Sequence, residues 1–173
     1  MEQRADPTTA EVWAWLSAIE DPEIPAISIV DLGIVRDVAW GETNAGTECV
    51  VTVTPTYSGC PATSAIARSI VEALQGHGIT RIKLETRMAP PWTTDWMSAA
   101  GKEKLKAQGI APPASQRIPV SAIRRSAWLS PRSECPRCKS PNTELISQFG
   151  STPCKALYRC QECREPFDYF KSH

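Results

Sequence analysis

Four of the seven cysteines form two Cys-x-x-Cys pairs near the end of the chain. The pairs are Cys135/Cys138 and Cys160/Cys163, and twenty-one residues separate them. The two sulfurs of each pair can face one ion, and the residues between the pairs can supply a hairpin. This is the arrangement of a four-cysteine zinc ribbon, with a gap slightly longer than usual. The spacing predicts a structural zinc ion, and an iron–sulfur cluster on the same thiolates is the rival prediction.

Cys154 adds a fifth thiol to this region, six positions before Cys160. It is either an alternative metal ligand or a free thiol beside the site. A module of this size is not expected to fold without its metal. Because four protein ligands close the coordination shell of zinc, the site predicts no catalysis.

Cys60 is a second candidate for chemistry, in the stretch from Thr54 to Thr63. A β-rich run precedes it and an apolar, helix-periodic run follows it. Pro61 suits the first position of a helix, so we expect Cys60 to be the N-cap. Unpaired backbone N–H groups and the helix dipole would then favour the thiolate, which is the form that binds metals. The alternative is a small buried cysteine that caps the helix for packing reasons alone.

Three carboxylates, Asp21, Glu23 and Asp31, lie within eleven residues of one another. Pro22 and Pro25 exclude a regular helix from the first part of this stretch. A solvated loop is the ordinary explanation for such a cluster of acids. A role facing a metal ion is the alternative.

The elements around Cys60 predict a small α+β fold. A capping box at Thr8 and Glu11 begins a first helix that ends at Asp21-Pro22. Alternating apolar residues predict three strands, and a helix between the second and third of them makes a crossover. These two strands should therefore be parallel and belong to a mixed three-stranded sheet. Cys60 is expected at the carboxyl end of the second strand, which is the edge where open α/β sheets place their ligand sites. The expected ranges are helix 8–20, strand 34–40, strand 49–54, helix 62–74 and strand 79–88.

Three aromatic side chains outside these elements have open roles. Trp92 and Trp96 precede a short helix, expected over 98–108 and ended by Gly109. They either cover the end of the sheet or form a docking patch for another protein. His77, between two glycines, is expected to be an exposed loop residue without a nearby partner, and no chemistry is assigned to it.

Composition divides the chain into an α+β domain at 8–110, a linker at 111–133 and a zinc-ribbon module at 134–173. The linker contains prolines, arginines and apolar side chains, so part of it is expected to pack. Residues 1–103 hold fourteen acids against seven Lys and Arg, whereas residues 104–173 hold twelve Lys and Arg against five acids. The two parts either dock on each other or present distinct partner surfaces. The apolar linker residues are Ile118, Val120, Ile123, Trp128 and Leu129.

The sequence excludes several classes of protein. No apolar run approaches the length that spans a membrane, and no segment reads as a signal peptide, so we expect a soluble cytoplasmic protein. No P-loop, dinucleotide fingerprint, Ser-His-Asp triad or di-iron Glu-x-x-His pair is present. Basic residues near the cysteines make nucleic-acid binding conceivable, but the neutral net charge and the acidic larger domain disfavour it.

Several motifs together carry a family resemblance. The run from Asp21-Pro22-Glu23 to Asp31-Leu32-Gly33, with Cys60-Pro61, resembles the small domain of iron–sulfur assembly factors. The runs 89–96, 149–155 and 159–171 and the first cysteine pair are similar to the PaaD family, whose members are accessory subunits of the phenylacetyl-CoA epoxidase system of aerobic phenylacetate degradation. The resemblance covers the chain from about Val12 onward.

The resemblance implies a function without catalysis of its own. In that system a di-iron subunit performs the epoxidation, and a reductase with flavin and a [2Fe–2S] cluster supplies electrons. PaaD-type subunits are thought to help mature one of these iron centres. Cys60 matches the cysteine that the assembly domain is thought to use, and Glu23 and Asp31 match acidic positions of its signature. One departure is Ser172, where cysteine is expected in relatives.

Three hypotheses follow. In the first, the protein is a maturation factor whose Cys60 holds iron or an iron–sulfur cluster transiently. The other ligands come from a second copy of the chain or from the client protein. The client is the reductase or the di-iron subunit. In the second, it is a stoichiometric, non-catalytic subunit of the oxygenase complex, and Cys60 is structural. In the third, it is a zinc-ribbon protein that binds nucleic acid.

Overall fold

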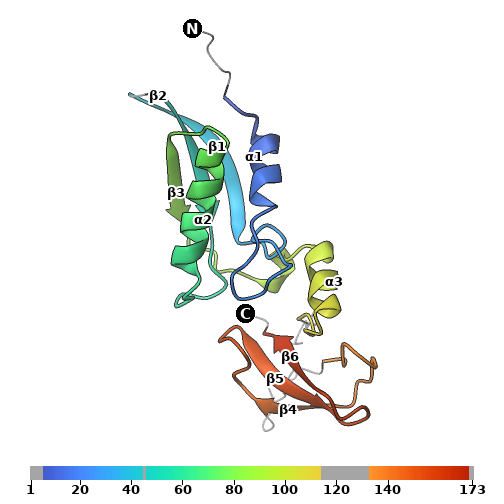
Figure 1. Cartoon of the computed structure of the whole chain (residues 1–173). Coiled ribbons are helices and arrows are strands. Elements are labelled where there is room, and N and C mark those ends of the chain that lie inside the picture. Colours follow the sequence, from blue (N-terminus) through green and yellow to red (C-terminus); the bar gives the residue numbers. More distant parts are fainter. Residues whose placement is uncertain (1–5, 45, 114–132, 172–173) are drawn as a thin grey trace. The chain divides into compact units, whose positions relative to one another are not determined.

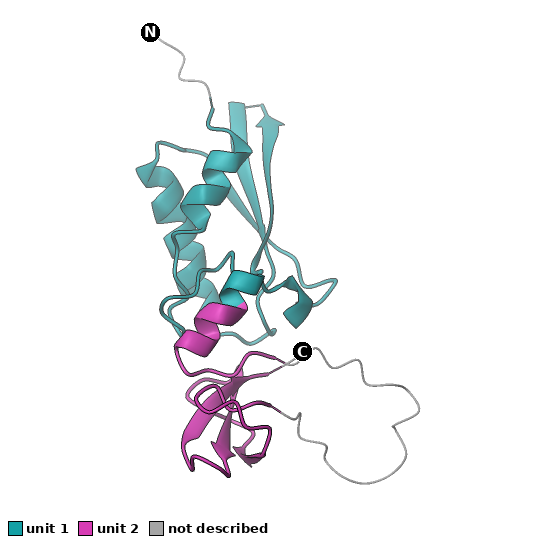
Figure 2. Ribbon diagram, turned by 90° about the vertical axis from the view of Figure 1, so that its right-hand side faces the viewer, with its two compact units in different colours: residues 1–101 teal, residues 102–173 magenta. Residues whose placement is uncertain are grey.

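The computed structural model describes residues 6–44, 46–113 and 133–171. The chain divides into two compact units, residues 1–101 and residues 102–173 (Figure 2). The apolar and arginine residues of the segment 114–132, for which packing is predicted, lie outside the described residues, and so does Ser172. None of the helices described is both long and apolar enough to span a bilayer.

The first unit begins with helix α1 (Thr9–Leu16), which has the predicted capping box. The backbone N–H of Glu11 donates to the Thr8 hydroxyl, and the Glu11 carboxylate accepts from the Thr8 backbone in return. Val12 and Leu16 are buried on the inner side of the helix. The Trp15 ring stacks on the His77 ring with 4.0 Å between centroids. His77 is exposed, as predicted. The expectation that it has no nearby partner is wrong, because its ring stacks on Trp15.

The sheet of this unit has the predicted mixed topology. Strand β1 (Val35–Thr43) pairs antiparallel with β2 (Gly46–Val53), and β2 pairs parallel with β3 (Ile82–Thr86). The first hairpin is tighter than expected, because Glu42 still pairs with Thr47. Figures 1 and 2 show helices α1 and α2 on the same face of the sheet.

Helix α2 (Thr63–Gly76) makes the crossover between the parallel strands. Ile66, Ile70 and Leu74 are buried, as their spacing along one helical face predicts. The backbone N–H of His77 closes the last turn on carbonyls of the helix. The helix therefore runs away from the carboxyl end of β2 and places the connection that contains Cys60 at that end.

The loop between α1 and β1 is more compact than its prolines and acids predict. Ile24, Ile27 and Ile29 are buried, and a short bridge pairs Glu20 with Ser28. Asp21 is 6% exposed, and its Oδ1 accepts hydrogen bonds from the backbone N–H groups of two residues that follow it, Glu23 and Ile24, both at 2.9 Å. A solvated loop is thus the wrong description for Asp21, because its carboxylate organises the turn.

The aromatic segment after β3 packs against this loop. The Trp92 ring is buried, and its Nε1 donates to the Leu32 carbonyl at 2.9 Å. The Arg36 guanidinium lies 3.5 Å from the centroid of the partly exposed Trp96 ring. Gly33 has a φ of 70°, and a Cβ there would overlap the backbone carbonyl of Trp96. For Trp92 the geometry is that of a core residue.

A short 3-10 helix, η1 (Thr94–Trp96), leads to helix α3 (Ala99–Ala107). Ser98 caps α3, since its hydroxyl accepts from the backbone N–H of Gly101 at 2.8 Å. Gly109, with a φ of 74°, follows the helix as its spacing predicts.

The second unit contains an antiparallel ribbon in the order β4 (Thr143–Ser147), β5 (Lys155–Cys160) and β6 (Pro166–Phe170). Its core is small and aromatic: Tyr158, Phe167 and Tyr169 pack with the buried ligand-type cysteines Cys135 and Cys160. The predicted hairpin between the cysteine pairs is β4–β5, and β6 adds a third strand after the second pair. The predicted fold, a mixed three-stranded α+β domain followed by a ribbon, is confirmed.

Candidate metal centre and iron-handling cysteine

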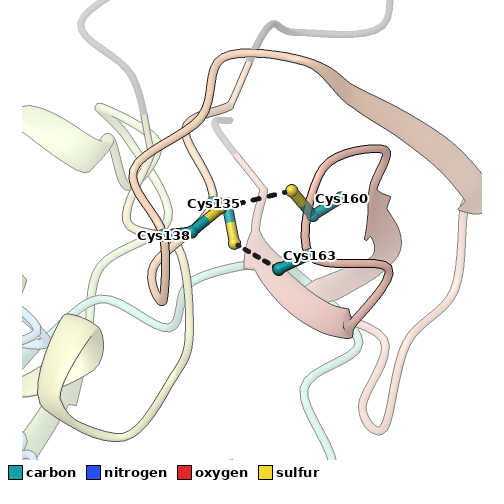
Figure 3. Close-up of side chains that lie close together, drawn as sticks. All are labelled: Cys135, Cys138, Cys160 and Cys163. Carbon is teal, nitrogen blue, oxygen red and sulfur yellow. Dashed lines mark hydrogen bonds between the residues drawn. The ribbon is translucent and has the colours of Figure 1, made fainter.

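The four cysteines of the two pairs converge on one point, as Figure 3 shows. Their sulfurs all lie within 4.8 Å of one another. The cross-pair distances are 3.7 Å from Cys135 Sγ to Cys163 Sγ and 3.5 Å from Cys138 Sγ to Cys160 Sγ. A tetrahedral zinc ion with Zn–S bonds of about 2.3 Å separates its sulfurs by about 3.8 Å. The donor set therefore fits a zinc ion, which would be held by these four thiolates.

The two halves of this centre have the same backbone construction. The N–H of Cys135 donates to the carbonyl of Ser140 at 2.9 Å, and the N–H of Cys160 donates to the carbonyl of Glu165, also five residues on, at 3.0 Å. Each tight turn has a residue of positive φ directly after its second cysteine. We call these two turns, 135–140 and 160–165, the zinc knuckles.

Burial divides the four thiols into two kinds. Cys135 and Cys160, the first of each knuckle, are buried, whereas Cys138 and Cys163 are exposed. Burial acts to raise the pKa of Cys160, but backbone N–H groups of Cys163 and Glu162, together with the thiols of Cys138 and Cys163, lower that pKa to about 7. N–H groups that point at a sulfur favour the thiolate that zinc requires.

Cys154 does not join this cluster. It directly precedes β5, and Cys160 ends that strand, so the two residues are about 20 Å apart along an extended chain. The Cys154 thiol is buried and lies 3.0 Å from the Thr152 hydroxyl. The structure thus brings together Cys135, Cys138, Cys160 and Cys163 and leaves Cys154 at the other end of the ribbon.

Cys60 lies in the connection between β2 and α2, at the carboxyl end of β2 as predicted. It is not the N-cap of the helix, because α2 begins at Thr63 and its N-cap is Ala62. Pro61 and Ala62 form an extra turn before the helix. The loop is nevertheless held firmly: the Thr63 hydroxyl and the Thr63 N–H both donate to the Cys60 carbonyl, at 2.9 and 3.2 Å.

The Cys60 thiol is half-buried and its pKa is raised above the ordinary value. Burial is the largest cause, and the negative charges of Glu23 and Asp21 add to it. The Ala62 N–H and the Thr63 hydroxyl oppose these effects without overcoming them. The expectation that a helix terminus favours the thiolate is therefore wrong, because burial and the two carboxylates together favour the protonated thiol.

The two predicted acidic residues make different interactions. Glu23 is half-buried and acts on the Cys60 thiol through its charge. Asp31 instead accepts a hydrogen bond from the Ser98 hydroxyl at 2.7 Å, and its backbone carbonyl accepts from the Ser98 N–H at 2.8 Å. Asp31 thus fixes the residue that caps α3.

The effect of the Asp21 charge on the Cys60 thiol was not predicted from the sequence. Asp21 is buried and its charge also acts on the thiol. The signal was available: an aspartate whose side chain can accept from N–H groups two and three residues later marks a capped turn. What could not be read was that this turn lies next to the β2–α2 connection, some forty residues further along the chain.

Comparison with protein families divides the chain at a similar place. Residues 9–83 match the model of the family described as iron–sulfur cluster assembly protein. Residues 124–171 match the family described as PaaD zinc beta ribbon domain. A crystal structure described as domain of unknown function DUF59, from Bacillus anthracis, is 33% identical and superposes with a TM-score of 0.50. The match covers 56% of this chain and 89% of that structure.

One curated relative matches nearly the whole chain. It is a protein of Escherichia coli K12 that is named as a subunit of a "Putative 1,2-phenylacetyl-CoA epoxidase". The two sequences are 50% identical over 167 residues, which is 96% of this chain and 94% of the relative. Taken with the assembly-type domain and the four-cysteine ribbon, this identity shows that the chain belongs to the PaaD family.

Proposed function

We propose that this protein is a maturation factor for an iron centre in another subunit of a phenylacetyl-CoA epoxidase system. In this proposal Cys60 holds the cargo, which is iron or an iron–sulfur cluster, until a client subunit takes it. The client is the reductase or the di-iron subunit of the system. The zinc knuckles keep the second unit folded and take no part in the transfer.

One observation carries the proposal: Cys60 is partly exposed, and the charge of a carboxylate side chain, Glu23, acts on its thiol. The thiol is half-buried, so an ion and a visiting protein can both reach it. Glu23 is near enough for its charge to raise the pKa of the thiol. Thiolates are the ligands of iron–sulfur clusters and carboxylates bind harder divalent ions, so the two side chains offer iron both kinds of donor.

The chemistry at Cys60 is a reversible ligand exchange. On loading, the thiol gives its proton to solvent and the sulfur forms a bond to iron. On delivery, the Fe–S bond breaks in favour of client ligands, and the sulfur regains a proton. A single thiolate leaves most of the coordination positions of iron unfilled, so the other ligands come from Glu23, from solvent, and from the client or a second copy of this chain. Weak, incomplete ligation favours release.

The function is tested by iron retention and by client activation. The full-length protein is loaded anaerobically with radioactive ferrous iron, desalted, and mixed with epoxidase subunits that were produced without it. We expect Cys60→Ala to lose at least nine-tenths of the retained iron and of the activation. Cys49→Ala is the matched control, since Cys49 is a fully buried thiol in the same unit and should keep both.

The outcomes separate the hypotheses. Zinc content and circular dichroism establish that each variant is folded. Normal activation of the epoxidase by a folded Cys60→Ala protein would refute the maturation role. If, in addition, the protein stays bound to the complex through turnover, it is a stoichiometric structural subunit.

A further inference from the structure

Two of the largest exposed apolar side chains lie at one end of the ribbon. Within the described part of the chain, three large apolar residues are strongly exposed: Met88, Ile146 and Phe149. Phe149 is 69% exposed and Ile146, three residues before it, is 53% exposed. Lys171 lies against the Phe149 ring, and we call these two residues, with Ile146 three positions before Phe149 in the sequence, the ribbon patch.

The ribbon patch is held in place by several contacts. The Lys171 ammonium lies 4.9 Å from the Phe149 ring centroid and donates to the Gln148 carbonyl at 3.1 Å. The Phe149 N–H donates to the Ser147 hydroxyl at 3.1 Å. An exposed aromatic ring that is already ordered loses little conformational freedom on binding, which is what an interface anchor requires.

The turn beyond Phe149 is fixed to the strands as well. The Ser151 hydroxyl donates to Asp168 Oδ2 at 2.6 Å, and the buried Lys155 ammonium lies 3.8 Å from the same atom. Gly150 passes so close to Asp168 that a Cβ there would approach its Oδ1 to 2.5 Å. These contacts support the end of the ribbon that presents Phe149.

We infer that the ribbon patch is the surface by which this protein docks on the subunit that it serves. The occupant is another subunit of the epoxidase system, and the inference rests on the proposed function for that choice. A chain whose relative is named a subunit needs a surface for its neighbours. The exposed ring calls for an apolar pocket, and the Lys171 ammonium beside it calls for a carboxylate at the edge of that pocket.

This surface is separate in sequence from the iron-handling cysteine. Cys60 and Glu23 belong to the first unit, whereas the ribbon patch belongs to the second. Docking and delivery therefore use different residues. A ribbon-patch variant should lose affinity for the client, whereas a Cys60 variant should lose iron retention and keep that affinity.

The test measures binding of the full-length protein to the purified remaining epoxidase subunits by biolayer interferometry. We expect Phe149→Ser to raise Kd at least tenfold, and Lys171→Gln to raise it about threefold and to reduce its dependence on salt. Met88→Ser is the matched control, because Met88 is 47% exposed but lies in the first unit. One zinc ion per chain confirms that the ribbon variants are folded.

Unchanged affinity of Phe149→Ser overturns the inference. So does protection of the patch in the free protein, detected by hydrogen exchange, if the first unit or a second copy of the chain covers it. Failure of the proposed function looks different. If Cys60→Ala binds and activates the client normally while Phe149→Ser does not bind, docking stands and maturation through Cys60 falls.

Discussion

Lys139 and Arg164 have the same left-handed backbone conformation, with φ values of 63° and 64°. Each directly follows the second cysteine of a zinc knuckle. Neither is a glycine or asparagine, the residues that adopt this conformation most readily. Both knuckles therefore contain a strained residue at the same position.

This strain predicts that glycine at either position stabilises the ribbon. The left-handed region costs a residue with a side chain about 1–2 kcal/mol, and glycine avoids this cost. Glycine also makes the unfolded chain more flexible, which offsets about 0.5–1 kcal/mol of the stabilisation. We expect Lys139→Gly or Arg164→Gly to raise the free energy of unfolding of the second unit by about 0.5–1 kcal/mol. Zinc competition with a chromogenic chelator measures the gain. Arg137→Gly, within the first knuckle but without a positive φ, should give none.

Removal of zinc should unfold one unit and leave the other folded. The core of the ribbon includes Cys135 and Cys160 themselves, so without the metal its aromatic side chains lose their main support. Zinc binding contributes about 10 kcal/mol or more to small modules of this kind. In heteronuclear NMR spectra, excess chelator should collapse the signals of 133–171 and preserve those of 6–101. Simultaneous loss of both sets would contradict this prediction.

Glu23→Gln should have opposite effects on two properties of Cys60. The negative charge of Glu23 helps to raise the thiol pKa, so its removal moves that pKa down and increases the thiolate fraction at any pH below it. Alkylation by iodoacetamide at pH 8 should therefore become faster. If Glu23 also ligates iron, retention of iron should fall in the same variant. Slower alkylation would show that the charge does not act on the thiol.

Iron loading should depend on pH in the direction set by the raised pKa. Since the thiol must lose a proton to bind iron, affinity should increase with pH, by up to tenfold per unit below the pKa. Titration of the Cys60 thiolate absorbance gives the pKa directly, with Cys60→Ala as the blank. An affinity that is flat between pH 6 and 8 would show that the thiolate is already formed at rest.

Asp31 and Ser98 should behave as a structural pair. Ser98→Ala removes the cap of α3 and should cost about 1 kcal/mol. Asp31→Ala should cost a similar amount, and the double variant less than the sum, because both act on the same cap. Denaturant unfolding measures all three. Iron retention at Cys60 should not change, and a large loss of iron in Asp31→Ala would show that Asp31 handles iron, as the family resemblance implies.

The sequence predicted the parts of this structure that depend on local pattern. The Thr8–Glu11 cap, the parallel pairing of β2 with β3 and the convergence of the four cysteines follow from side-chain types and spacing. The start of α2 could not be predicted, because Pro61 is compatible both with a first helical position and with the turn that is found. The stacking of Trp15 on His77 and the capping of α3 through Asp31 join residues more than sixty positions apart.

The pKa of the Cys60 thiol could not be predicted from local sequence pattern either. Its place at the end of a strand was predictable, but its pKa depends on burial and on a turn around Asp21 that only the folded chain brings near. A rule for helix termini gave the opposite direction. The direction of a pKa shift is set by the three-dimensional environment, and at Cys60 burial outweighs the nearby N–H group.

The raised pKa of the Cys60 thiol has a consequence for the reactivity of this sulfur toward oxidants. Peroxides and other oxidants attack sulfur through its anion, and the ladder of irreversible damage begins there. In the proposed cycle the thiol loses its proton to solvent when a metal ion binds, and between deliveries it is in the protonated form, which reacts more slowly with oxidants. The same burial that raises its pKa therefore lowers the fraction of thiolate that an oxidant can attack.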